Sequence, residues 1–330
     1  MYSHVSTSPS TSTPQVVCAG LIVADHVCPP LDHLPRPGEI VQVDELLLNI
    51  GGGAANTAVD LARLGVSAAV AARVGGDAFG QFAAQTLKEA GVATDHVLTD
   101  ARRPTSQTLI VNVRGQDRRF IHTQGANAGF VAADLDAALE HPPRVLHIGY
   151  FLILPNLRAD ELASRFARAR QAGVITVLDV ATPGPGRYLE ALEVVLPHTD
   201  VFVPNSDEAE LITSIADPVH QARLFHNMGA ARVVVTRGEH GLVSISNDLK
   251  VRLGAYPTEL VDGSGGGDAF NAGYIAGLLE GRAELECLKL ASALGASCVR
   301  AVGTTAGVFT RAEAEDFINR HPITIETLET

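Results

Sequence analysis

The sequence predicts an α/β fold in which a mostly parallel sheet has helices on both faces and carries a small β-sheet lid. Short β-branched runs alternate with Ala- and Leu-rich segments through most of the 330 residues, as expected of parallel strands joined by crossover helices. Two stretches interrupt this alternation and have the pattern of strands outside the main sheet. We interpret them as lid insertions around residues 25–50 and 103–125, lying over the carboxyl ends of the main strands, where open α/β sheets bind ligands.

The individual elements follow from the local patterns. Strands of the main sheet are expected at residues 15–22, 68–74, 145–148, 174–179, 201–204 and 232–236. Helices are expected between them at residues 54–64, 78–90, 160–172, 206–214 and 220–228. In the second insertion, residues 105–123 predict a hairpin that turns at Arg114-Gly115-Gln116-Asp117. We interpret residues 16–330 as one domain that contains all of these elements.

Composition and charge exclude several classes of function. Hydrophobic residues make up 46% of the chain, enough for a sizeable core, and the formal net charge of −12 gives no positive field for a nucleic acid or an anionic membrane. No apolar run approaches the roughly 18 residues of a membrane span. Residues 1–15 are rich in Ser, Thr and Pro and lack the parts of a secretory signal, so we interpret them as a disordered tail. The four cysteines lack zinc-knuckle spacing, which predicts reduced thiols in a cytoplasmic protein.

The strongest local signal is a glycine run that leads into a helical pattern. Gly265, Gly266 and Gly267 precede an Ala-, Ile- and Leu-rich pattern over residues 269–279. Free N–H groups and the helix dipole make such a junction an anion site, and glycine lets a phosphate approach closely. Asp268 follows directly, where it suits a base that takes a proton from a phosphoryl acceptor. From this segment alone, the roles of base and of helix N-cap are equally favoured.

A second glycine run precedes the helix expected at residues 54–64. It consists of Gly51, Gly52 and Gly53, and Asn56 follows within the first turn, where its amide suits hydrogen bonds to neutral hydroxyls. A tight turn with close helix packing is the simpler interpretation. Neither run is a Walker loop, because none of the three lysines follows a glycine. Asn56 also stands where a dinucleotide fingerprint requires its third glycine.

Two further strand ends carry polar residues. Asn205 and Glu208 start the helix expected at residues 206–214, where they either cap the helix or face magnesium and phosphate through water. The strand expected at residues 232–236 runs into Thr236, Gly238 and Gly241. These residues form either a nucleotide-binding edge or a plain hairpin turn.

The order of these motifs is similar to that in a known family. A Gly-Gly loop ending in Asn-x-Ala is followed by Pro-Asn-x-x-Glu-Ala at residues 204–209, Thr-x-Gly-x-x-Gly at 236–241 and Asp-x-x-Gly-x-Gly-Asp-x-Phe at 262–270. The chain thus resembles the ribokinase-like (PfkB) carbohydrate kinase family over roughly residues 16–318. The resemblance implies an enzyme that uses ATP and Mg²⁺ to phosphorylate a sugar or, alternatively, a nucleoside.

The resemblance also implies a role for each matched residue. Asp268 corresponds to the catalytic base, and the amides of Gly265, Gly266 and Gly267 correspond to the anion hole for the γ-phosphate. The acceptor site corresponds to Asp25, Gly51, Gly52, Gly53 and Asn56. The ATP and metal sites correspond to Asn205 and Glu208 (phosphate, and magnesium through water), to Thr236, Gly238 and Gly241 (nucleotide), and to Asp262, Ser264 and Gly303 (a loop that holds K⁺ in ribokinase).

Three departures from the pattern concern the acceptor. Gly53 stands where ribokinase carries a lysine, Val23 where it carries an asparagine, and Gly263 where a threonine is common. They argue against ribose as the acceptor.

A nicotinamide-dependent oxidoreductase and a sugar-binding protein without transfer activity are the alternatives from other classes. The exposed edges of a strand lid, together with the resemblance, predict a homodimer formed through the lid.

Overall fold

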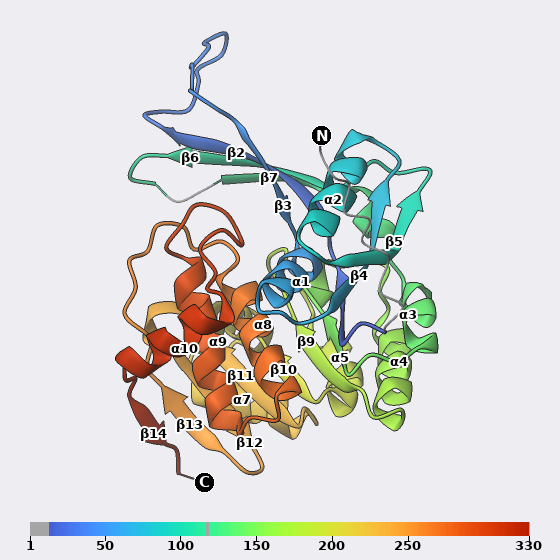
Figure 1. The fold of residues 1–330 in the computed structure, drawn as a ribbon, viewed down its shortest axis with the longest axis vertical. Helices are drawn as coiled ribbons and strands as arrows, with labels where there is room; N and C mark the ends of the chain where they lie inside the picture. The colour runs from blue at the N-terminus through green and yellow to red at the C-terminus, as the bar shows by residue number, and fades with distance from the viewer. Residues whose placement is uncertain (1–12, 117–118, 330) are drawn as a thin grey trace, which may run out of the picture.

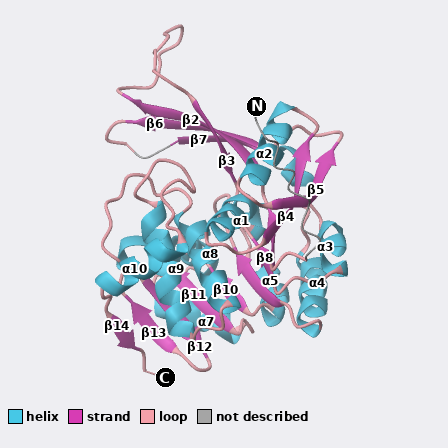
Figure 2. Ribbon diagram, viewed as in Figure 1, coloured by secondary structure: helices cyan, strands magenta, loops and turns pink. Residues whose placement is uncertain are grey.

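The structure is a computed structural model that describes residues 13–116 and 119–329. Residues 1–12 of the predicted tail lie outside the described residues, as does part of the predicted hairpin turn. A large sheet flanked by helices carries a smaller sheet that projects from one end (Figures 1 and 2). In the described part of the chain, no helix combines the length and apolar character needed to cross a bilayer.

The large sheet confirms the prediction of a mostly parallel arrangement. In spatial order its strands are β14 (Ile325–Thr327), β13 (Lys250–Leu253), β12 (Leu242–Ser246), β11 (Arg232–Thr236), β10 (Val201–Val203), β9 (Ile175–Asp179), β8 (Val145–Ile148), β1 (Val16–Gly20), β4 (Ala68–Gly75) and β5 (Ala93–Asp100). Neighbours from β11 to β5 are parallel, whereas β12, β13 and β14 add an antiparallel edge that the sequence reading did not predict. The six expected strands are all present.

Helices cover both faces of the large sheet, as predicted. They are α1 (Gly53–Arg63), α2 (Ala78–Glu89), α3 (Asp136–Glu140), α4 (Ala159–Gln171), α5 (Leu189–Val195), α6 (Ser206–Thr213), α7 (Pro218–Asn227), α8 (Gly266–Leu279), α9 (Glu284–Cys298) and α10 (Arg311–Arg320). Alternate residues of β1 enter two separate cores. Val16 and Cys18 belong to the core that contains buried residues of α1, α2, α8, α9 and α10, and Val17 and Ala19 belong to the core that contains buried residues of α3 to α7. Because successive side chains of a buried strand point to opposite faces of the sheet, neighbouring residues of β1 face different helix layers.

The small sheet contains the two predicted insertions. Its strand order is β3 (Leu47–Gly51), β2 (Val23–Leu31), β6 (Gln107–Val113) and β7 (Arg119–Thr123), and β2 is antiparallel to β3 but parallel to β6. The hairpin of β6 and β7 is confirmed. In its turn, Gly115 has a φ of 73°, and the Gln116 N–H donates to the Val113 carbonyl at 3.0 Å.

The outer end of β2 contains two prolines. The strand continues through Pro29 and Pro30 to Leu31. Pairing of β2 with β3 ends at Val27, so the prolines lie where the strand has a neighbour on one side only. A missing N–H is tolerated at such a position.

Candidate active site

Asp268 lies in a buried polar cluster at the carboxyl ends of the parallel strands. The residue is 1% exposed, and its Oδ2 accepts hydrogen bonds from Asn56 Nδ2 at 2.8 Å and from the Tyr150 hydroxyl at 2.9 Å. Its Oδ1 is buried and has no hydrogen-bond partner among residues 13–116 and 119–329. One carboxylate oxygen is therefore held in place, and the other is available to accept a proton.

The environment of Asp268 brings its titration close to neutral pH. Burial raises the pKa of Asp268 to about 6, and the hydrogen bonds from Asn56 and Tyr150 act in the opposite direction. A general base is most effective when its pKa lies near the working pH. This carboxyl group meets that condition.

Helix α8 begins at the first glycine run that the sequence singled out. Gly265 precedes the helix with a φ of 77°, and a Cβ there would lie 2.1 Å from the Thr304 carbonyl oxygen, so only glycine fits. No side chain of the described residues caps this helix end, which leaves its first N–H groups for an anion. A Cβ at Gly267 would meet no described atom within 4 Å. The N-cap interpretation of Asp268 is wrong, because Gly265 holds the N-cap position.

Each glycine of the second run lies close to a neighbouring group. A Cβ at Gly51 would lie 1.9 Å from the Asp25 carboxylate, one at Gly53 would lie 3.0 Å from the Tyr150 ring, and one at Gly52, whose φ is 95°, would lie 2.5 Å from a backbone carbonyl. The expectation of a tight turn with close packing is confirmed. The Asp25 carboxylate lies against Gly51, two residues before α1 begins.

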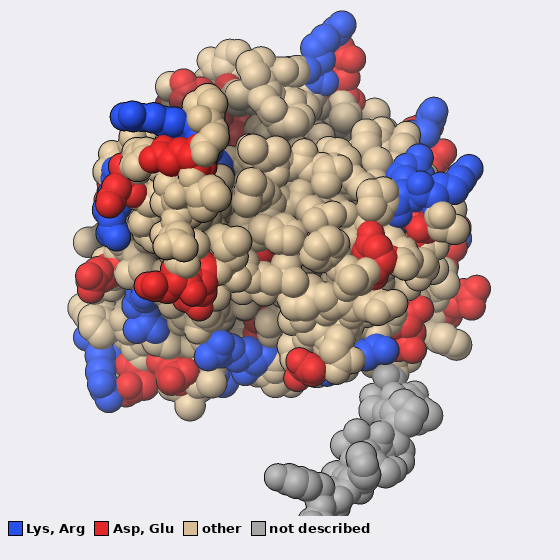
Figure 3. All heavy atoms as spheres, turned by 90° about the horizontal axis from the view of Figure 1, so that it is seen from above, with Lys and Arg blue, Asp and Glu red and all other residues tan. Residues whose placement is uncertain are grey.

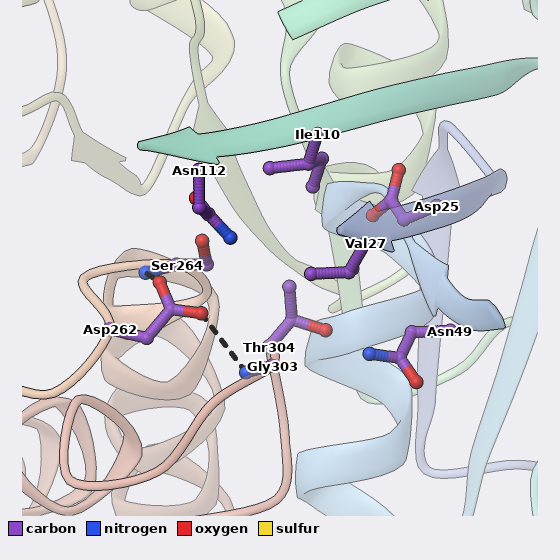
Figure 4. A pocket seen from close by; sticks show the side chains of 9 residues that line it. All are labelled: Asp25, Val27, Asn49, Ile110, Asn112, Asp262, Ser264, Gly303 and Thr304. Carbon is purple, nitrogen blue, oxygen red and sulfur yellow. Dashed lines mark hydrogen bonds between the residues drawn. The ribbon is translucent and has the colours of Figure 1, made fainter. Parts of the chain in front are cut away.

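A pocket lies between the small sheet and the loops at residues 261–265 and 301–305 (Figure 4). Its lining is Asp25, Val27, Asn49, Ile110, Asn112, Asp262, Ser264, Gly303 and Thr304. Asp25 is 8% exposed, and burial raises its pKa to about 6, against lowering effects of Thr108 and His26. Carboxylate and amide groups beside two apolar walls suit a small hydroxyl-rich molecule.

Asn205 and Glu208 lie at the N-terminus of α6. The Asn205 side chain accepts from the Glu208 N–H at 2.8 Å, and the Glu208 carboxylate accepts from the Asn205 N–H at 3.0 Å. The predicted helix cap is therefore confirmed. Burial, followed by the charges of Asp207 and Asp268, raises the pKa of Glu208 to about 7, so this carboxyl also lies within electrostatic reach of Asp268.

The expected nucleotide edge adjoins this helix end. Thr236 forms an isolated parallel bridge with Asn205, and its N–H donates to the Pro204 carbonyl at 3.0 Å. The chain then turns through Gly238 and Gly241 into the antiparallel strand β12, so a hairpin turn is present as the simpler interpretation expected. A Cβ at Gly238 would meet no described atom within 4 Å, whereas one at Gly241 would lie 2.0 Å from a backbone carbonyl. Of these two glycines, Gly238 is the one that faces open space.

Comparison with known protein families identifies the family of this chain. The model of the pfkB family carbohydrate kinase matches residues 13–311. The chain belongs to the pfkB family of carbohydrate kinases. The ribokinase of Haemophilus influenzae is similar to this kinase, with 29% identity over 308 residues that cover 91% of this chain and 96% of that protein. The nicotinamide-dependent alternative has no support from these findings.

Solved structures share the fold of this PfkB kinase. Arabidopsis thaliana ribokinase, solved with ribose and ATP, superimposes with a TM-score of 0.79 at 22% identity, covering 93% of this chain and 99% of that one. A putative ribokinase II from E. coli, solved with ATP and Mg²⁺, gives a TM-score of 0.78 at 24% identity, covering 93% of this chain and all of that one. The ribokinase-like fold class predicted from the sequence is thereby confirmed.

Three residues at this site of the kinase, Asp179, Asn271 and Tyr150, were not predicted from the sequence. Asp179 ends β9, and its carboxylate accepts a hydrogen bond from the Val180 N–H at 2.8 Å. The side chain of Asn271, one turn after Asp268, also interacts with the Asp179 carboxylate. Burial and the charges of Glu208 and Asp268 raise the pKa of Asp179 well above its usual range. An acid at the end of a predicted parallel strand was an available signal for Asp179. Tyr150 had no such signal, because an aromatic residue after a strand is usually part of the core.

Oxygen ligands are present at these strand ends, but they do not form a ready-made metal cage. In the described ranges, no three His, Cys, Asp or Glu residues are arranged to hold a metal ion. Mg²⁺ in kinases commonly binds one or two carboxylates and takes its other ligands from water and phosphate. Asp179 and Glu208 fit that pattern.

The predicted cation loop of the kinase joins two segments far apart in the sequence. Asp262 accepts from the Ser264 N–H at 2.9 Å and from the Gly303 N–H at 3.0 Å, the latter drawn in Figure 4. The Cys298 thiol donates to the carbonyls of Ser264 at 3.3 Å and Thr304 at 3.2 Å. These contacts hold the loop at residues 301–305 against the entry to α8.

Proposed function

We propose that this kinase transfers the γ-phosphoryl group of ATP to a hydroxyl group of a neutral sugar or sugar-like molecule. In this reaction the acceptor oxygen forms the new bond to phosphorus while the bond between phosphorus and the ADP oxygen breaks. The acceptor proton passes to Oδ1 of Asp268, which acts as the base. The single observation that carries the proposal is this carboxylate at an uncapped helix N-terminus, with Oδ2 held and Oδ1 unpartnered among the described residues.

Helix α8 supplies the anion hole in this proposal. The N–H groups at Gly265, Gly266 and Gly267 are at a helix start, where the dipole favours negative charge. Open space at Gly267 leaves room for a phosphate oxygen. Such fixed donors stabilise charge on the transferred group without reorganisation during the reaction.

We assign the nucleotide to the adjoining ends of β10 and β11. Thr236 and Gly238 would line it, with Gly241 shaping the turn, and Asn205 would face its phosphates. Glu208 and Asp179 would hold Mg²⁺ through water, and the ion, when bound, neutralises charge on the phosphates.

The acceptor is assigned to the pocket under the small sheet. Asp25 would accept hydrogen bonds from acceptor hydroxyls. Asn56 on α1 would support this end through Thr304, whose hydroxyl donates to Asn56 Oδ1 at 2.9 Å. The ionisable groups that line the pocket, Asp25 and Asp262, are both acidic, so an acceptor that already carries a phosphate is disfavoured. We further propose that a monovalent cation such as K⁺ supports the loop of Asp262, Ser264 and Gly303 through backbone carbonyls.

We also propose that two copies associate through the outer face of the small sheet. Seen from that side, a broad area free of charged side chains is bordered by charged ones (Figure 3). A cross-strand row on the outer face presents Leu48, His26, Leu109 and Ile121, and the three aliphatic members of this row are exposed. An apolar strand face of this kind is commonly covered by a partner.

The buried free thiols of the described cysteines and the use of ATP support a cytoplasmic location.

The substitution Asp268→Asn tests the proposed base. It removes the proton acceptor but keeps the shape, so ATP binding should change little, whereas turnover should fall by about 10²–10⁴. ATP affinity is measured by calorimetry, and turnover by coupled ADP release over a panel of sugars, sugar phosphates and nucleosides. Asp95→Asn, at an exposed position, is the control.

Two results would contradict the proposal in different ways. Turnover by Asp268→Asn near the level of the unmodified enzyme would remove Asp268 from the role of base. Absence of ADP release with every acceptor in the panel would instead favour the sugar-binding protein without transfer activity.

A further inference from the structure

Tyr150 occupies a strained position at the end of strand β8. Its backbone has a φ of 60° and a ψ of 43°, and only one other described non-glycine residue, Ser214, has a positive φ. A left-handed conformation is unfavourable for a non-glycine residue, because its Cβ lies too close to the following carbonyl oxygen. Surrounding contacts must therefore hold Tyr150 in place, and such strain is concentrated at functional sites.

The contacts that hold Tyr150 come from the first turn of α1. The ring lies against Gly53, where a Cβ would be 3.0 to 3.2 Å from three ring carbons. The preceding Gly149 packs equally closely, since a Cβ there would lie 2.9 Å from the Gly53 carbonyl carbon. The absence of a side chain at position 53 thus creates the space that the ring fills.

The hydroxyl group of Tyr150 is directed at the catalytic carboxylate. It donates to Asp268 Oδ2 at 2.9 Å, the same oxygen that accepts from Asn56. Burial and the neighbouring carboxylates raise the pKa of Tyr150 well above its usual range, so the phenol keeps its proton and remains a donor. A donor fixed on Oδ2 favours the charged form of Asp268, which is the form that acts as a base.

We propose that Tyr150, seated on Gly53, is a positioning residue that holds the Asp268 carboxylate charged and oriented for proton abstraction. This inference rests on the proposed role of Asp268. With Oδ2 bound to Tyr150 and Asn56, the acceptor proton goes to Oδ1, and Tyr150 neither gains nor loses a proton. The contact joins residues 118 positions apart.

Other titratable groups also face this pair and must be kept constant in a test. They are Asp179 on β9, Glu208 on α6, Asp60 on α1, Cys18 on β1 and Cys298 on α9. All of them are unchanged in a Tyr150→Phe variant. A difference in pH profile between that variant and the unmodified enzyme therefore reports the lost hydroxyl.

The test is the pH dependence of kcat for Tyr150→Phe between pH 5 and 9. Without the hydroxyl, the pKa of Asp268 should rise, so the acid limb moves to higher pH. We expect kcat to fall about 10- to 100-fold at pH 6, as for loss of a hydrogen bond to a charged group, and by much less at pH 8.5, with the KM for ATP unchanged. Tyr188→Phe is the matched control, because that hydroxyl donates to the Gly184 carbonyl at 2.7 Å, and its profile should not move.

Gly53→Ala provides a second test that keeps the hydroxyl. The added methyl group would displace the ring, so the acid limb should move in the same direction. This variant decides the question if Tyr150→Phe does not fold. An unmoved acid limb, or an equal loss of kcat at every pH, would overturn the proposal. If that result accompanies an inactive Asp268→Asn, only the role of Tyr150 fails, whereas an active Asp268→Asn removes the role of Asp268 itself.

Discussion

The two ends of the proposed site are built in different ways. The phosphate end consists of helix starts at the ends of parallel strands, namely α8 after Gly265 and α6 after Asn205. Its groups come from short continuous segments, and many of them are backbone N–H groups. The acceptor end collects side chains from the small sheet and from the loop at residues 301–305 (Figure 4). The proposed phosphate end is therefore local in the chain, while the proposed acceptor end depends on how two sheets are placed together.

This difference has a consequence for what each end tolerates. Backbone donors are present whatever the side chains are, so the phosphate end can remain constant while the acceptor end changes. Gly53 and Tyr150 lie on the border between the two, because the ring rests on α1 and the hydroxyl contacts Asp268. A change at this border affects the reacting carboxylate as well as the shape of the acceptor site.

The largest effect that separates the two ends is expected from Asp25→Asn. Each hydrogen bond from a sugar hydroxyl to the charged Asp25 carboxylate is worth about 1.5–3 kcal/mol. Its loss should lower kcat/KM for the sugar about 10- to 150-fold. The affinity for ATP should stay within about twofold by calorimetry, because Asp25 lies at the opposite end. Asp32→Asn, an exposed residue paired with Arg114 just after β2, is the control and should change neither value. An equal loss of ATP affinity in Asp25→Asn would break the division.

A smaller effect is expected at the phosphate end from Gly267→Ala. The methyl group would enter the space assigned to a phosphate oxygen, so kcat should fall about tenfold, a loss of about 1.4 kcal/mol in transition-state stabilisation. Replacement of a helical glycine by alanine should at the same time stabilise the fold by about 0.5–1 kcal/mol, seen as a higher Tm. Gly76→Ala, where a Cβ would make only an ordinary contact 3.6 Å from Thr99, controls for the added methyl group. Unchanged turnover in Gly267→Ala would show that the phosphate does not approach there.

The smallest effect on chemistry is expected from the outer face of the small sheet. Leu109→Lys places a charge in the exposed apolar row, so the proposed dimer should dissociate to monomers while kcat changes by less than about threefold. Light scattering after size-exclusion chromatography at micromolar concentration measures the mass. Leu98→Lys is the matched control, since Leu98 is 39% exposed on β5 and Leu109 is 41% exposed on β6. A monomeric unmodified protein would refute the dimer, and a dimeric Leu109→Lys would place it on another face.

Several features of this kinase were predictable from the sequence alone because their causes are local. The run from Gly265 to Asp268 predicts a helix start with free N–H groups, and helix α8 begins within that run. Asn205 and Glu208 predict a cap, and they cap each other across three residues. Alternation of strand and helix patterns predicts the parallel sheet, because each β-α-β unit closes over neighbouring segments. The roles of these residues in binding and catalysis stay predictions.

The tertiary structure decided everything that depends on contacts between distant segments. Asn56 reaches Asp268 across 212 positions and Tyr150 reaches it across 118, and no local pattern contains either partner. The position of Gly265 at the N-cap of α8 excludes Asp268 as the cap, and the packing of Tyr150 assigns Gly53 as the seat of an aromatic ring. The thiol of Cys298, which the sequence offers only as a reduced cysteine, lies between the carbonyls of Ser264 and Thr304. The sequence by itself determined the elements and the glycine and cap motifs at the helix starts, whereas packing of α1, β8 and α8 around one buried carboxylate decided how that carboxylate is held.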